Sequence, residues 1–162
     1  KDLATCFLAH GFTRIVFVNG HGGNVTPYQQ ALFELRQDLR TRRDVLLLGL
    51  TYWDAAGNPA DKIPGLVQKR MGHACEWETS MVLRLNPQLV AGDVKGVPEV
   101  PFGKALEPGY RAWVMPDRSE PGHIGAPAAA TPEKGEALFS HFAAGVASYL
   151  ERVAAWDGSW DQ

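Results

Sequence analysis

Apolar residues recur along the chain with two different periods. An apolar run at 15–18 and a nearly continuous one at 45–52 predict two short buried strands. Between these runs, five residues at helical spacing predict an amphipathic helix: Tyr28, Ala31, Leu32, Leu35 and Leu39. Strands that alternate with helices are typical of a parallel sheet covered on both faces, so the pattern predicts an α/β fold.

Capping signals mark the ends of three further helices. A helical pattern at 2–10 stops at Gly11, which is typical of a helix C-terminus. A second pattern runs from about 74 to 85. The triplet at 131–133 supplies an N-cap threonine, a proline at the first helical position and an acid in the first turn. It therefore predicts the start of the last helix.

The segments between these helices are rich in proline and glycine. Asn24 is expected to cap the helix that contains Tyr28. The segment 54–72 is predicted to be a long loop, and loops of that length often carry function. Within the irregular region that follows the third helix, 110–115 is a candidate strand.

Length and composition exclude several classes of protein. The 162 residues, of which 45% are hydrophobic and 21% charged, fit one globular domain spanning 1–162. A formal net charge of −2 gives no basic footprint for nucleic acid or membranes, and no apolar run approaches the roughly 20 residues that span a bilayer. Two cysteines, Cys6 and Cys75, form no disulfide framework, so we expect a cytoplasmic protein.

The segment 17–24, Phe-Val-Asn-Gly-His-Gly-Gly-Asn, places His21 among glycines at the end of the first predicted strand. Open α/β sheets bind ligands at the carboxyl ends of their strands. His21 is therefore a candidate metal ligand, and the alternative is a histidine that packs in a glycine-rich turn. The loop matches neither the Gly-x-Gly-x-x-Gly fingerprint nor a P-loop, which argues against a phosphate cradle.

A second cluster, at 72–80, opens the predicted third helix with one histidine and two acids. Glu76 and Glu78 lie about 200° apart on a helix, so only one of them can face a given site. His73 can meet Glu78 only if it lies outside the regular turn, at the mouth of the helix. That arrangement suits a metal ligand, Glu78, beside a proton-transfer group, His73. The alternatives are a solvated helix acid and a helix-capping histidine.

These two motifs, together with Gly-x-Pro-x-x-Ala-Thr-x-Glu-Lys-Gly at 125–135, resemble the creatininase (creatinine amidohydrolase) family. They occur in the family's order and span residues 15–140. The resemblance implies a three-layer α/β/α sandwich with a mainly parallel sheet, in a homo-oligomer that is often a hexamer. It also implies two divalent metal ions per complete subunit, zinc or manganese, and hydrolysis of an amide C–N bond by a metal-activated hydroxide.

The resemblance also assigns roles to individual residues. His21 and Glu78 match the metal-ligand positions, and His73 matches the histidine that transfers a proton. The backbone N–H groups of Gly22 and Gly23 are then expected to bind the substrate oxygen.

Two departures from the family pattern change these expectations. The Glu-x-His pair and the bridging aspartate of the family have no counterpart before His21, where only Asp2 and His10 occur. We therefore interpret the chain as the C-terminal portion of such a domain, without the N-terminal metal-ligand segment. Gly22 and Gly23 replace a bulky residue and an acid of creatininase, and Lys69-Arg70 replaces its Trp-Asp pair. These changes favour a different non-peptide or cyclic amide over creatinine.

Three functions are consistent with the sequence. The first is a metal-dependent amidohydrolase, and the second is a catalytically silent binding or assembly subunit with the same fold. The third, a nucleotide-binding Rossmann-like domain, rests on the glycine-rich loop alone. The sequence leaves open which amide is the substrate, and a site with nitrogen and oxygen ligands serves zinc or manganese.

Overall fold

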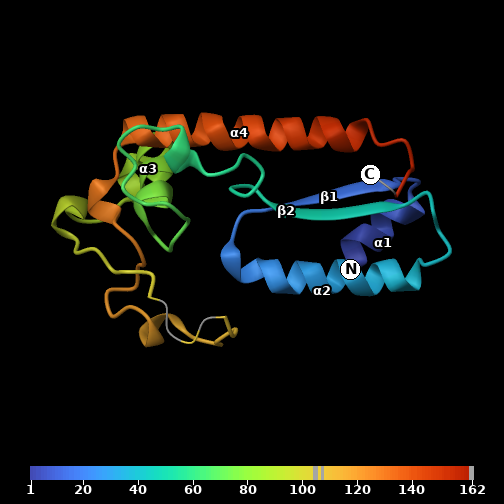
Figure 1. Ribbon diagram of the computed structural model, residues 1–162, viewed down its shortest axis with the longest axis horizontal. Coiled ribbons are helices and arrows are strands. Elements are labelled where there is room, and N and C mark those ends of the chain that lie inside the picture. The colour runs from blue at the N-terminus through green and yellow to red at the C-terminus, as the bar shows by residue number, and fades with distance from the viewer. Residues whose placement is uncertain (104–105, 107, 161–162) are drawn as a thin grey trace. The chain divides into compact units, whose positions relative to one another are not determined.

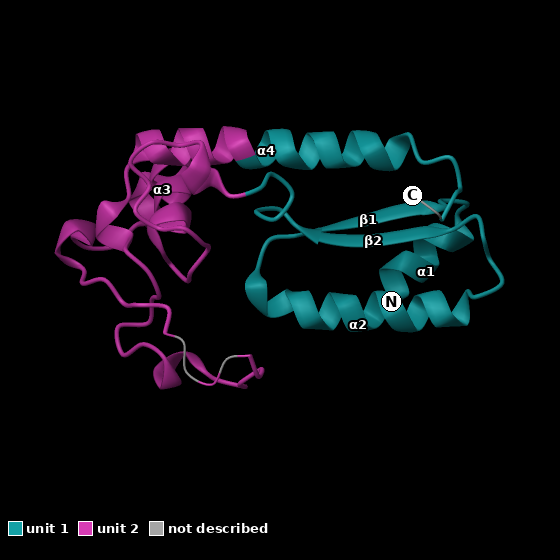
Figure 2. Ribbon diagram, in the orientation of Figure 1, with its two compact units in different colours: residues 1–57, 142–162 teal, residues 58–141 magenta. Residues whose placement is uncertain are grey.

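The computed structural model (Figure 1) describes residues 1–103, 106 and 108–160 of the chain. They form two compact units (Figure 2). Unit 1 comprises residues 1–57 and the segment from Phe142 onward, and unit 2 comprises residues 58–141.

Unit 1 is built on a parallel pair of strands. β1 (Arg14–Asn19) and β2 (Leu46–Thr51) pair in register from Arg14 opposite Leu46 to Asn19 opposite Thr51. Helix α2 (Val25–Asp38) provides the crossover between them. Both predicted strands and the predicted helix are confirmed. Because the strands are parallel, Asn19 and Thr51 lie together at the carboxyl edge of the sheet.

Helices cover both faces of this strand pair, which gives unit 1 three layers (Figure 1). On one face, α1 (Asp2–Ala9) and α2 pack through a core of Ala4, Ile15 and Leu35. On that face the ring of Tyr28 packs against Gly49. A Cβ on Gly49 would lie 2.6 Å from the ring, so this contact requires glycine. The C-terminal part of α4 (Pro132–Ala154) covers the other face.

Unit 2 contains α3 (Glu76–Leu85), the first turns of α4 and long loops with short 3-10 turns. Two antiparallel bridges join these loops, His73 with Ile124 and Val100 with Gly125. Thr131 caps α4 as predicted, because its Oγ1 accepts a hydrogen bond of 3.2 Å from the N–H of Lys134. None of the helices in the described ranges combines the length and apolarity that crossing a bilayer requires.

Two local expectations are wrong. The segment 110–115 is not a strand: Tyr110 is 89% exposed and Val114 62% exposed, so its apolar residues face no core that would hold it in a sheet. Asn24 precedes α2, but its side chain makes no capping hydrogen bond. A 3-10 turn at Gly22–Asn24 comes between His21 and the helix, and the His21 side chain caps that turn instead.

The contact between α3 and α4 generates a first prediction. A Cβ on Gly135 would lie 2.0 Å from the backbone oxygen of Ser80, so the two helices touch through their backbones. In an isolated helix, replacing glycine by alanine stabilises by about 1 kcal/mol. Here we expect Gly135→Ala to lower the free energy of unfolding by about 2 kcal/mol, measured by urea denaturation. A stabilised variant would contradict the close contact.

Candidate functional site

The loop that carries His21 is anchored by one buried side chain, that of Asn19. Its Oδ1 accepts a hydrogen bond of 3.1 Å from the His21 N–H, and its Nδ2 donates to the His21 carbonyl oxygen at 2.8 Å. The same Nδ2 lies 3.1 Å from Thr51 Oγ1, at the end of the neighbouring strand. Asn19 therefore fixes the backbone of His21 at the carboxyl edge of the sheet.

The His21 ring lies against the backbone of Gly23. Its Nδ1 accepts a hydrogen bond of 3.1 Å from the Gly23 N–H. A Cβ on Gly23 would lie 3.1 Å from two atoms of this ring, so glycine admits the contact. A neutral imidazole whose Nδ1 accepts a hydrogen bond carries its proton on Nε2. The Gly22 N–H, by contrast, makes no hydrogen bond with a residue that the structure describes.

His73 lies outside the third helix, as the predicted geometry requires. Its N–H donates to the Ile124 carbonyl oxygen at 3.0 Å, and its own carbonyl accepts from the Ile124 N–H at 2.8 Å. A Cβ on Gly72 would lie 2.1 Å from that Ile124 oxygen, so only glycine permits the bridge. The next residue, Ala74, has a φ of +46°. A left-handed alanine is strained by roughly 1–2 kcal/mol, and this turn separates His73 from the start of α3 at Glu76.

Glu78 carries a buried oxygen that is not satisfied. Its Oε2 is inaccessible and has no hydrogen-bond partner among the residues that the structure describes. Burying a carboxylate oxygen without a partner costs free energy unless a cation or a donor lies against it. Neighbouring residues of the motif have structural contacts instead: Thr79 Oγ1 donates to the Ala74 carbonyl at 3.2 Å, and Ser80 Oγ accepts from the Thr131 N–H. Glu78 is therefore the residue of this helix that is suited to bind a ligand.

Glu76, the other acid, is a structural residue. Its side chain is fully buried, and its oxygens accept hydrogen bonds of 2.9 Å from the N–H groups of Val67 and Gln68. Its Oε1 lies 2.6 Å from the Nζ of Lys134. The two acids of α3 thus face different surroundings, as their angular separation predicts.

The third motif, at 125–135, forms the scaffold around this ion pair. Gly125, with a φ of +120°, leaves room for Gln68, whose Oε1 would lie 2.6 Å from a Cβ there. The same Oε1 accepts from the N–H of Glu76 at 2.7 Å and from that of Ala126 at 2.8 Å. Gln68 could not be predicted, because nothing in its local sequence distinguishes it from any other loop glutamine.

A further acid, Asp54, follows β2 and was also missed. It lines a cavity of about 320 Å³ within unit 1, together with Thr51, Tyr28, Tyr149 and Arg152. Burial raises the pKa of the Asp54 carboxyl above its ordinary value. The only signal for it in the sequence is its position just after a strand.

The structure assigns the predicted site residues to different units. His21, Gly22 and Gly23 belong to unit 1, whereas His73 and Glu78 belong to unit 2. Their convergence on one site therefore stays a prediction. Among the described residues, no three His, Cys, Asp or Glu side chains form a group that could hold a metal ion.

The donors that are present still fit a divalent metal in their chemistry. An imidazole and a carboxylate are ligands that zinc and manganese both accept. The unsatisfied Oε2 of Glu78 is the observation that favours a cation here. Within the described chain, no third donor joins either residue in such a group, and their assignment as metal ligands stays a prediction.

Comparisons with known proteins agree on one family. The family model described as creatininase, creatinine amidohydrolase, matches residues 1–150. The mycofactocin precursor peptide peptidase of Mycolicibacterium smegmatis is 32% identical over 86% of this chain and 49% of its own length. The peptidase of the same name from Mycobacterium tuberculosis is 33% identical over 88% of this chain and 49% of its own length.

Solved structures agree with these sequence matches. A crystal structure of creatinine amidohydrolase (creatininase) has a TM-score of 0.72 at 30% identity, covering 93% of this chain and 60% of that one. A Mn creatininase has a TM-score of 0.69 at 31% identity, with the same coverage of 93% and 60%. A further solved variant is described as a Zn-Zn type. The predicted α/β/α creatininase-like fold is thereby confirmed, while the chain spans about half the length of the curated relatives it matches.

The Asn19 contacts generate a second prediction. Asn19→Ala removes three hydrogen bonds at the carboxyl edge of the sheet, and we expect it to destabilise the protein by about 1–3 kcal/mol. Asn19→Ala should also accelerate amide hydrogen exchange at Gly22 and Gly23. Asn24→Ala is the matched control, because the Asn24 side chain caps nothing, and it should change stability by less than about 0.5 kcal/mol. Equal effects of the two substitutions would disprove the anchoring role.

The buried ion pair generates a third prediction. Lys134→Met leaves the Glu76 carboxylate buried without its cation and should lower the free energy of unfolding by about 3 kcal/mol. Adding Glu76→Gln to Lys134→Met removes that buried charge. The double variant should therefore be more stable than Lys134→Met alone in urea denaturation. If Glu76→Gln recovers no stability, Lys134 does not stabilise the protein by compensating the charge of Glu76.

Proposed function

The chain belongs to the creatininase family, and from this premise we propose that the protein is a metal-dependent amidohydrolase that cleaves an amide C–N bond. The observation that carries this proposal is the unsatisfied buried oxygen of Glu78, because the side-chain oxygens of Glu76, Thr79 and Ser80 on the same helix have partners within unit 2. Because the family consists of hydrolases, ligand binding is the simplest explanation for an unsatisfied acid at position 78.

In this proposal His21 and Glu78 hold a divalent cation, zinc or manganese, and a complete subunit binds two ions. Solved relatives of both metal types support the choice of metals. When bound, such an ion would lower the pKa of a coordinated water toward about 7 and polarise the carbonyl group of the substrate.

The His21 ring then links ligand binding to the glycine loop. Its Nδ1 accepts the Gly23 N–H, so Nε2 carries the proton of the neutral ring. If His21 held a metal ion through either nitrogen, this hydrogen bond would be lost, because a neutral imidazole has only one lone pair in its plane. The Gly23 N–H would then be available to donate to the substrate oxygen, next to the Gly22 N–H. Two backbone donors at such an oxygen stabilise the charge that develops on it.

His73 is proposed as the group that passes a proton to the leaving nitrogen. Its backbone is fixed by Ile124 and its ring lies before the helix that carries Glu78. An imidazole nitrogen can accept a proton and give it up again, so the ring can act as a general acid or base within one turnover.

The substrate that we propose is a non-peptide or cyclic amide other than creatinine. A second candidate is a peptide bond in a short peptide, which the similarity to the mycofactocin precursor peptide peptidases favours. Both substrates require the same chemistry at the carbonyl carbon. The rates of hydrolysis across a panel of cyclic amides, formamides and short peptides therefore distinguish them.

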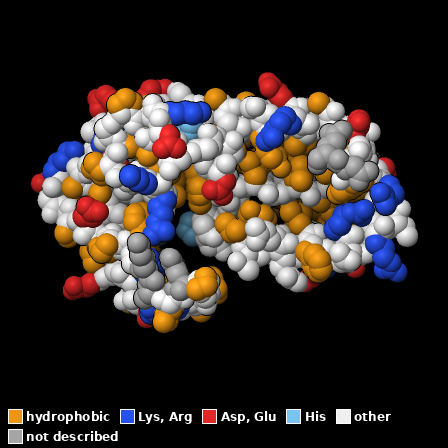
Figure 3. Space-filling view, in the orientation of Figure 1, with side chains coloured by type: hydrophobic (Ala, Val, Ile, Leu, Met, Phe, Trp, Pro, Cys, Tyr) orange, Lys and Arg blue, Asp and Glu red, His pale blue; other side chains and the backbone are white. Residues whose placement is uncertain are grey.

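We further propose a cytoplasmic homo-oligomer, with a hexamer as the expected assembly. Apolar side chains gather on the face of unit 1 between α4 and α2 (Figure 3), and exposed apolar patches of this kind are typical of surfaces that further protein covers. The alternative function, a silent assembly subunit, shares this surface and differs in binding no metal.

The metal ligands generate a fourth prediction. The purified natural protein should bind close to two divalent ions per subunit, and removing them with a chelator should abolish amide hydrolysis until Zn²⁺ or Mn²⁺ is restored. His21→Ala and Glu78→Gln should each lower metal affinity by more than about tenfold. His73→Gln should retain the metal and lower kcat by about 10²–10⁴-fold.

His10→Ala is the matched control, because His10 is an exposed histidine outside the proposed site, and it should retain both metal and activity. A protein that binds no metal and hydrolyses no amide would favour the silent subunit. Activity that survives His21→Ala undiminished would disprove the metal assignment.

A further inference from the structure

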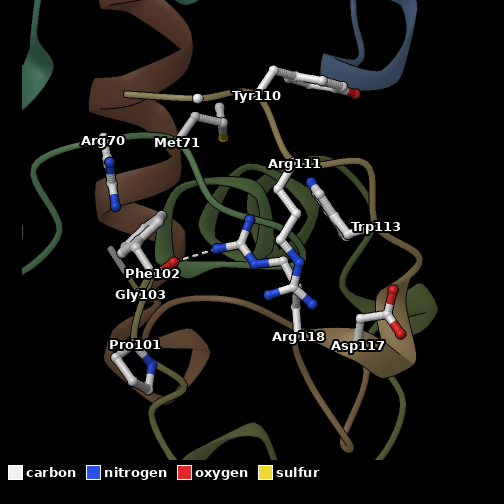
Figure 4. A pocket seen from close by; sticks show the side chains of 11 residues that line it. Arg70, Met71, Pro101, Phe102, Gly103, Tyr110, Arg111, Trp113, Asp117 and Arg118 are labelled. Atoms are coloured by element: carbon white, nitrogen blue, oxygen red, sulfur yellow. Dashed lines mark hydrogen bonds between the residues drawn. The ribbon is translucent and has the colours of Figure 1, made fainter. Parts of the chain in front are cut away.

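Unit 2 contains a pocket of about 490 Å³ that lies outside the motifs discussed above. Its walls come from the end of the long loop, at Arg70 and Met71, and from residues 101–103, 109–111, 113, 117 and 118. The volume falls within the range of small-molecule sites in proteins. The side chains of Arg111 and Arg118 extend into the middle of the pocket (Figure 4).

The pocket carries excess positive charge. Three arginines, Arg70, Arg111 and Arg118, line it against a single carboxylate, that of Asp117. Asp117 Oδ2 accepts a hydrogen bond of 3.0 Å from the Val114 N–H, and none of the three guanidinium groups forms an ion pair with an acid among the described residues.

The three arginines are not equivalent. The Arg70 guanidinium lies 4.4 Å from the centre of the Phe102 ring, and that of Arg118 lies 4.8 Å from the Trp113 ring. Arg118 also donates to the Phe102 carbonyl oxygen. Arg111 has no hydrogen bond or ring contact with any residue in the described part of the chain. One complete guanidinium fork is therefore available to a ligand, between aromatic walls.

We propose that this pocket binds a carboxylate attached to an apolar or aromatic group. A guanidinium fork binds a carboxylate through two parallel hydrogen bonds. The Arg111 fork, which has no partner among the described residues, accommodates one carboxylate. The rings of Phe102, Tyr110 and Trp113 supply flat apolar surface for the rest of the ligand.

The pocket adjoins the proposed proton-transfer residue. Met71 lines the pocket, and His73 follows it after one residue. Two residues of chain span at most about 7 Å. This inference rests on the proposed function. The amide substrate carries a carboxylate, Arg111 binds that carboxylate, and the amide group lies toward His73.

Binding and turnover test this inference separately. The probe is N-acetyl-L-phenylalanine, compared with its uncharged primary amide, by isothermal titration and ligand-observed NMR with the natural protein. We expect the acid to bind at least about tenfold more tightly than the amide, as a charge-assisted contact implies. Arg111→Gln should remove this preference. Arg40→Gln, an equal change of charge at an exposed arginine of unit 1, should retain it.

Equal affinity for acid and amide, or an unchanged preference in Arg111→Gln, would overturn the inference. In a kinetic arm, kcat/KM for amides with a carboxylate should fall in Arg111→Gln, while that for neutral amides should not. If neutral amides are hydrolysed equally well and Arg111→Gln changes nothing, the inference fails and the proposed function stands. If the acid binds through Arg111 and no amide is hydrolysed, the proposed function fails and the pocket assignment stands.

Discussion

The buried carboxylate of Glu76 determines the local structure of unit 2. It joins three segments that are distant in sequence, because it accepts hydrogen bonds from the loop at 67–68, begins α3 and pairs with Lys134 at the start of α4. A buried carboxylate is tolerated only when several donors and a cation surround it. The ion pair between Glu76 and Lys134 therefore constrains the positions of His73 and Glu78, which lie on the same stretch of chain as Glu76.

Unit 1 positions its candidate residue by the same means. Asn19 is buried at the end of β1, and its amide satisfies both the N–H and the carbonyl of His21. In each unit, one buried polar side chain with several partners fixes the backbone near a candidate ligand-binding residue. Hydrogen bonds of this kind hold a loop at a defined position without regular secondary structure.

Periodicity in the sequence predicted both strands and every helix longer than one turn, because burial of one face is a local property of the chain. The motifs likewise identified His21, His73 and Glu78 as candidates. Gln68 and the pocket around Arg111 could not be predicted. The contact of Gln68 with Ala126 joins residues 58 positions apart, and such a contact leaves no periodic signal near either of them. Whether His21 and Glu78 meet is likewise a question of long-range placement, and it stays a prediction.

Two features that destabilise the folded state of unit 2 lie in one short segment, at Ala74 and Glu78. Ala74 holds a left-handed conformation, and the buried Oε2 of Glu78 has no partner in the described chain. Each feature destabilises the folded state by roughly 1–3 kcal/mol, and alanine and glutamate offer no packing benefit that offsets it. Gly72, by contrast, is required by the close approach of Ile124. Strain that no contact offsets is typical of sites whose geometry serves a ligand, and in this segment it is confined to Ala74 and Glu78, whereas Glu76 between them is explained by its buried ion pair.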